Sequence, residues 1–273
     1  MKGRDWVFAF AVCALLSLLY FGAFSWLLNA WLSDRYYSHG FLIPPIAIFL
    51  IWRALKSKPA QGRMPIAGIA LLCTGALMYV LGYAAQYQFA MALSIVPVLS
   101  GLALMLSEKG RHLLFPIHLL LTAIPLPWTA NFGIFLQKPS VYGSFWIVKL
   151  FKPDTLLQYP SIIVNGSSFN VELACSGLSG AIALFTIAII IAYFMRAPLW
   201  KKTAICALSV PFAVAANILR IALTVGVGVW FSPQVAEGFF HYASDLVLFI
   251  VALLLLVASS KVMKCLNFER IIP

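Results

Sequence analysis

The sequence predicts an all-α polytopic membrane protein with about eight transmembrane helices. Of its 273 residues, 63% are hydrophobic and only 10% are charged, whereas the apolar share of a soluble domain is about 45–50%. Apolar segments close to the ~20 residues that cross a bilayer recur along the chain. These observations exclude a soluble enzyme or a soluble binding domain.

The expected spans follow from the length of each apolar segment. Pro44 and Pro45 in the second span, and Pro116, Pro125 and Pro127 in the fifth, predict kinked or partly re-entrant helices there. The expected spans are residues 6–32, 41–55, 64–85, 89–107, 113–128, 176–195, 203–231 and 242–260.

Residues 129–174, between the fifth and sixth spans, are expected to form an extracytoplasmic excursion because they carry several charged residues, further prolines and an Asn-Gly pair. Within it, the aromatic segment 141–151 is expected to lie along the membrane interface as an amphipathic helix. The pair Asn165-Gly166 between β-prone residues predicts a hairpin just before Cys175. With no repeat of 20–50 residues evident, residues 1–273 are interpreted as one integral membrane domain.

The distribution of basic residues predicts the orientation. Eight spans place both termini on one side, where fourteen lysines and arginines lie, against four on the other side. Because cytoplasmic loops are enriched in Lys and Arg, both termini are expected in the cytoplasm, and Cys175 then faces the extracytoplasmic side of the plasma (inner) membrane. The net charge of +11 is explained by these loops, so no nucleic-acid partner is expected.

Cys175 is the first candidate functional residue. It precedes Ser176 and Gly177, where the polar excursion meets the sixth span. Backbone N–H groups at a helix N-terminus can stabilise a thiolate or an oxyanion. The alternative is a cysteine that only packs as a small apolar residue. The five cysteines form no CxxC pair, so neither a metal site nor a cofactor is expected.

Arg220 is the second candidate, because it lies inside the span 203–231. A guanidinium there costs at least about 2.5–3.5 kcal/mol, and charges within spans usually mark functional sites. Asn217, three residues earlier, shares its helical face. The alternative is a structural arginine that reaches the interface or pairs with a carboxylate.

His241 is the third candidate, at the start of the last span. Asp245 follows four residues later and could orient the imidazole. A lone interfacial histidine can also have no function. Together, however, a thiol, an imidazole and a guanidinium supply a nucleophile, a proton donor and a stabilising cation for acyl transfer.

With these motifs, the sequence resembles the exosortase/archaeosortase family of membrane-embedded cysteine transpeptidase-like enzymes. Residues 37–44 resemble its N-terminal signature and the prolines at 116, 125 and 127 resemble its middle segment. Residues 174–178 are similar to the motif of its nucleophile, residues 217–221 to its arginine motif, and His241 to its histidine.

The resemblance implies a cysteine protease or transpeptidase that cleaves C-terminal sorting signals of secreted proteins at the outer membrane face. Such a signal consists of a short motif, a transmembrane helix and a basic tail. Cys175, Arg220 and His241 would be catalytic, and Ser176, Gly177, Asn217 and Asp245 would support them. The acyl group would pass to a lipid or glycan acceptor, to another amine or to water.

Two other classes of function remain open from the sequence. A transporter would use Arg220 to bind an anion, but further charges within the spans and symmetry between the halves are then expected. A non-enzymatic membrane component of surface polysaccharide export would tolerate the loss of the Cys175 thiol.

Overall fold

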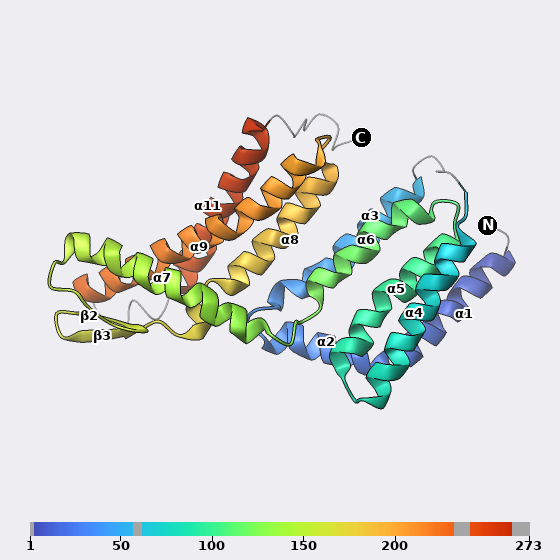
Figure 1. Ribbon diagram of the computed structural model, residues 1–273, viewed down its shortest axis with the longest axis horizontal. Coiled ribbons are helices and arrows are strands. Elements are labelled where there is room, and N and C mark those ends of the chain that lie inside the picture. Colours follow the sequence, from blue (N-terminus) through green and yellow to red (C-terminus); the bar gives the residue numbers. More distant parts are fainter. Residues whose placement is uncertain (1–2, 57–61, 232–240, 264–273) are drawn as a thin grey trace. The chain divides into compact units, whose positions relative to one another are not determined.

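The computed structural model describes residues 3–56, 62–231 and 241–263. The chain forms two compact units, Met1–Pro127 and Trp128–Pro273, and each is described by itself. Helices predominate in both units (Figure 1). The structure therefore agrees with the predicted all-α class, with a small sheet added in the second unit.

The described secondary-structure elements of the first unit are all helices. Its elements are α1 (Gly3–Leu19), α2 (Phe21–Ser33), the 3-10 helix η1 (Ser38–Leu42), α3 (Ile43–Lys56), α4 (Pro65–Ala84), α5 (Gln88–Leu106), α6 (Gly110–Leu119) and the 3-10 helix η2 (Leu120–Ala123).

Helices α4 and α5 pack closely because glycines line their contact. Gly68, Gly75 and Gly82 recur every seventh residue of α4 and are buried. A Cβ atom at Gly75 would lie only 2.8 Å from the backbone nitrogen of Val98 on α5. Small residues allow such close backbone approach between membrane helices, so these glycines set the separation of the pair.

Helix α2 and the segment that resembles the N-terminal signature are hydrogen-bonded to the end of η2 and to the residues just after it. The indole nitrogen Nε1 of Trp31 donates a hydrogen bond to the carbonyl oxygen of Ala123 at 2.7 Å. The backbone N–H of Leu126 donates to the hydroxyl of Tyr37 at 2.9 Å. Both prolines at 44 and 45 lie in the first turn of α3, where a missing backbone N–H costs no intrahelical bond.

The second unit carries the small sheet and the longest helix. Its elements are α7 (Thr129–Phe151), β1 (Leu156–Gln158), β2 (Ser161–Val164), β3 (Ser167–Asn170), the 3-10 helix η3 (Leu173–Cys175), α8 (Leu178–Phe194), α9 (Leu199–Trp230) and α11 (His241–Val262).

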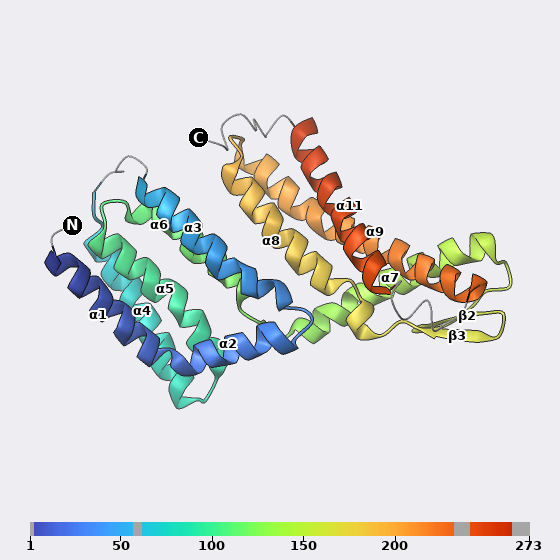
Figure 2. The same cartoon turned by 180° about the vertical axis from the view of Figure 1, so that it is seen from behind.

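The hairpin predicted at Asn165-Gly166 is confirmed. Strands β2 and β3 pair antiparallel, with Val164 opposite Ser167 across the two-residue turn. Asn165 and Gly166 have φ values of 51° and 79°, as a type I′ turn requires. β1 adds a third antiparallel strand on the other side of β2. Figure 2 shows the hairpin beside α7, from the side opposite to Figure 1.

The inner face of the hairpin is buried against α7 and α9. Because successive strand residues face opposite sides, β2 places only alternate residues in this core. The cluster consists of Val141, Phe145, Val148, Ile162, Val164, Phe169, Val171, Ile221, Ala222 and Val225. This core fixes the hairpin that leads to Cys175.

The predicted number of eight spans is not confirmed. Among the described residues, α4, α5, α9 and the combined segment Ser38–Lys56 are long and apolar enough to cross a membrane. The segments Phe10–Leu19 and Phe21–Ser33 make a fifth span if they count as one bent helix. Helix α8 and residues Leu246–Val262 are apolar but shorter.

Three expected elements differ from the structure. The first span bends by 69° between Phe10–Leu19 and Phe21–Ser33, next to Tyr20, whose buried hydroxyl is hydrogen-bonded to Ser94 of α5 at 2.8 Å. In place of the fifth span, α6 and η2 cover only residues 110–123, ~21 Å of helix. Residues 141–151, expected as a separate interfacial helix, are the C-terminal half of α7.

Candidate functional site

Cys175 is held at the end of the hairpin by contacts with α7. The 3-10 helix η3 ends at Cys175, and the half-buried Cys175 side chain packs against the core between hairpin, α7 and α9. Just before η3, Gln137 of α7 donates from Nε2 to the carbonyl oxygen of Val171 at 2.7 Å. The hydroxyl of Tyr159 donates to Oε1 of the same glutamine at 2.9 Å.

The turn after Cys175 begins helix α8. Gly177 is the N-cap residue, with φ of 82°, a left-handed conformation that glycine adopts without strain. Ser176 is fully buried, and the backbone N–H of Leu178 donates to its hydroxyl at 3.4 Å. The predicted position of Cys175 at the entrance of a helix is therefore confirmed.

Asn217 of α9 connects the Cys175 turn to α7. Its side chain is 5% exposed. The amide nitrogen Nδ2 donates to the carbonyl oxygen of Cys175 at 2.9 Å and to the hydroxyl of Ser140 at 3.0 Å. The hydroxyl of Ser140 in turn donates to the carbonyl oxygen of Ser176 at 3.2 Å. The carbonyl groups of Cys175 and Ser176 are thus both held by buried side chains.

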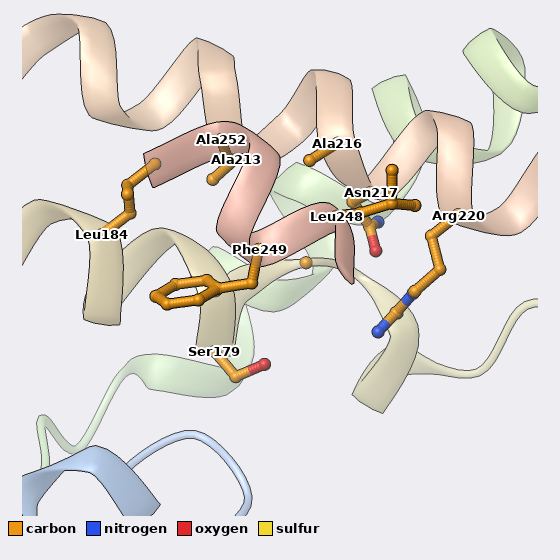
Figure 3. Close-up of a pocket in the computed structure, with 11 residues that line it drawn as sticks. Ser179, Leu184, Ala213, Ala216, Asn217, Arg220, Leu248, Phe249 and Ala252 are labelled. Atoms are coloured by element: carbon orange, nitrogen blue, oxygen red, sulfur yellow. The ribbon is translucent and has the colours of Figure 1, made fainter. Parts of the chain in front are cut away.

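Arg220 lies one turn beyond Asn217 on α9 and reaches the same backbone group. Only 6% of Arg220 is exposed, and its Nη2 lies 3.5 Å from the carbonyl oxygen of Cys175, at the long end of a hydrogen bond. Figure 3 shows Asn217 and Arg220 leaving α9 next to each other. A buried guanidinium therefore contacts the residue that carries the candidate nucleophile.

The third candidate residue lies outside the described side chains. Helix α11 begins at His241, so the backbone of His241 and Asp245 belongs to its first turns. The positions of the two side chains are not described, and their convergence on Cys175 stays a prediction.

A pocket lies beside the Cys175 turn, between α8, α9 and α11. It encloses about 360 Å³ of space, including its opening. Figure 3 shows Ser179 and Leu184 of α8, Asn217 and Arg220 of α9, and Phe249 of α11 around it. Among the described residues, no group of three His, Cys, Asp or Glu side chains could hold a metal ion.

A sequence profile described as transmembrane exosortase matches residues 31–258. The match includes the Cys175 turn, Asn217, Arg220 and the start of α11. The chain belongs to the transmembrane exosortase family. Searches among curated proteins and among solved structures found no significant match.

Membership of the exosortase family confirms the resemblance inferred from the sequence motifs. The family is one of membrane proteases and transpeptidases with a role in protein sorting. The protein is accordingly a membrane protein of this class.

The contribution of α7 to the candidate site was not predicted from the sequence. Gln137, Ser140 and Ser144 are buried on one face of α7, and two of them contact the segment around Cys175. The signal was present in the sequence, since polar residues recur at spacings of three and four, which places them on one helical face. A helix that begins at Thr129 and carries these residues was not predicted from the sequence.

Replacing Gly177 with alanine is expected to disrupt the site. A Cβ atom there would lie 2.7 Å from both Cβ and Cγ of Asn217, and alanine at φ of 82° adds about 1–2 kcal/mol of backbone strain. Thermal unfolding of the purified protein should show a lower Tm. Gly226→Ala on α9 is the matched control, because a Cβ atom there meets nothing within 4 Å. Equal Tm values for the two variants would contradict a structural role for the close contact between Gly177 and Asn217.

Proposed function

We propose that the protein is a cysteine protease or transpeptidase that cleaves C-terminal sorting signals of secreted proteins at the outer face of the membrane. The observation that carries the proposal is the contact between the buried guanidinium of Arg220 and Cys175 at the entrance of α8. An arginine within a membrane helix and a thiol before a helix N-terminus are each unusual. The contact of this arginine with the backbone carbonyl oxygen of the cysteine favours an active site.

In the proposed reaction, the thiolate of Cys175 attacks the carbonyl carbon of the scissile peptide bond. The C–N bond breaks, the leaving amine takes a proton from His241, and the acyl group remains on sulfur as a thioester. Arg220 and the positive end of α8 stabilise the negative charge of thiolate and oxyanion. An amine of a lipid or glycan acceptor, or water, then attacks the thioester and releases the thiolate.

The proposed function can be tested by detecting the thioester intermediate. Membranes containing the protein and the cell's own secreted proteins are solubilised in neutral hydroxylamine, which converts a thioester into a hydroxamate. Mass spectrometry should find proteins ending in a hydroxamate, truncated before a transmembrane helix. Cys175→Ala should abolish every such product; hydroxamates that persist in this variant would contradict the proposal.

The proposed orientation can be tested separately. Ser167 lies on the exposed face of β3 and Arg63 is exposed before α4. If the distribution of basic residues sets the topology, a membrane-impermeant maleimide added to intact cells should label a cysteine at position 167 but not one at position 63. The reverse labelling would place the site on the cytoplasmic side.

A further inference from the structure

The pocket beside the Cys175 turn shares residues with the candidate site. Asn217 and Arg220 line the pocket, and both donate to the carbonyl oxygen of Cys175. Gly177, two residues after Cys175, also lines it. The polar end of the pocket is therefore in contact with the backbone carbonyl group of Cys175.

Apart from Ser179, the rest of the pocket is apolar, and small residues leave its space open. Gly180, Ala213, Ala216 and Ala252 come from three different helices, α8, α9 and α11. Leu184 and Phe249 also line it (Figure 3). At Gly180, an added Cβ atom would meet nothing within 4 Å. The pocket thus combines an apolar interior with a charged and hydrogen-bonding end.

We propose that this pocket is a specificity pocket that takes one apolar side chain of the substrate, next to the bond that is cleaved. The inference rests on the proposed function, because it assigns the pocket to the segment that Cys175 attacks. Gly180 and Ala252 are then residues that determine which side chain fits. An apolar side chain fills the interior, and the peptide backbone remains at the end formed by Asn217 and Arg220.

The size of the pocket favours a single side chain over a helix or a long acyl chain. Its space of about 360 Å³ includes the opening to solvent, so the enclosed part is smaller than that. A helix with its side chains is about 10–12 Å across and does not fit. The substrate must also be unwound at the cleaved bond, since a helical carbonyl is hydrogen-bonded to the next turn. An unwound segment presents single side chains.

The pocket can be tested without a substrate by the reactivity of Cys175. The purified protein carries Ala at the four other cysteines, and methyl, hexyl and benzyl methanethiosulfonate are the probes. Each transfers its alkylthio group to the thiolate and releases methanesulfinate. If the pocket takes the alkyl group of a probe that reacts at Cys175, the hexyl and benzyl probes should react at least about tenfold faster than the methyl probe, each relative to its rate with glutathione, as burial of two methylene groups predicts.

Gly180→Leu should remove this preference, because the new side chain fills the pocket. Gly226→Leu is the matched control, since it also adds leucine at an open glycine, on α9, and outside the pocket. Both variants should keep the rate with the methyl probe, which needs no pocket. A hexyl-to-methyl ratio that is unchanged by Gly180→Leu, or lowered equally by both variants, would overturn the proposal.

Steric complementation tests whether the occupant is a peptide side chain. The hydroxamate product identifies the cut site of a substrate. Replacing one particular apolar residue next to that site with Asp should lower processing at least about tenfold. Gly180→Leu should process this substrate poorly and regain activity when that residue becomes Ala. If Gly180→Leu regains activity with Ala at none of the positions beside the cut, the pocket takes another occupant, such as a lipid chain, and the proposal is refuted.

The two tests separate this inference from the proposed function. If Cys175→Ala still processes substrates, the function is wrong, whatever the probes report. If processing needs Cys175 but the probes show no dependence on Gly180, the function stands and the specificity pocket is wrong.

Discussion

Cys175→Ala is expected to leave every substrate at full length, with its C-terminal helix attached. Loss of a catalytic nucleophile lowers turnover by roughly 10⁶-fold, which a gel-mobility assay registers as complete loss. The variant should still fold, because Asn217 and Arg220 both donate to the carbonyl oxygen of Cys175. Alanine keeps the carbonyl group.

The other described cysteines provide the controls for this variant. Cys73 is exposed on α4 and Cys206 is partly buried on α9. Cys73→Ala and Cys206→Ala should process substrates normally at matched membrane levels, as measured by the mobility of a tagged substrate. Processing by Cys175→Ala at a normal rate would remove the nucleophile assignment.

Much of the second unit could be predicted from local sequence. The Asn165-Gly166 turn imposes its own geometry, so the hairpin followed from two residues and their β-prone neighbours. The helix after Gly177 was predictable for a similar reason, since small residues precede a long apolar segment. Arg220 stood out because charge within an apolar span is costly.

The missed features depend on contacts between distant segments. The bend beside Tyr20 accompanies a hydrogen bond to Ser94, 74 residues away, and no local pattern around Tyr20 contains that partner. Ser140 acquires its role only because Asn217 and Ser176 lie against it. From their composition, residues 141–151 were also predicted to be a separate interfacial helix. In the structure, Val141, Phe145 and Val148 pack against the hairpin and α9.

Arg220→Lys is expected to abolish most processing although it keeps the positive charge. The Nη2 atom of Arg220 lies at 3.5 Å from the carbonyl oxygen of Cys175, and the shorter lysine side chain ends before that position. Lysine also lacks the planar array of donors of a guanidinium. Loss of one preorganised donor for the transition state typically costs about 10²–10³-fold in kcat, and we expect a decrease of that size.

The stability of this variant separates a catalytic from a structural arginine. Asn217 still donates to the carbonyl oxygen of Cys175 at 2.9 Å, so the turn before α8 should stay in place and the Tm of Arg220→Lys should fall only slightly. Arg196→Lys is the matched control, because Arg196 is exposed in the same unit; it should process substrates normally. If Arg220→Lys retains normal processing, or if its activity falls only in proportion to its folded fraction, the guanidinium is a structural ion, and the stabilisation of negative charge must come from the N-terminus of α8 alone.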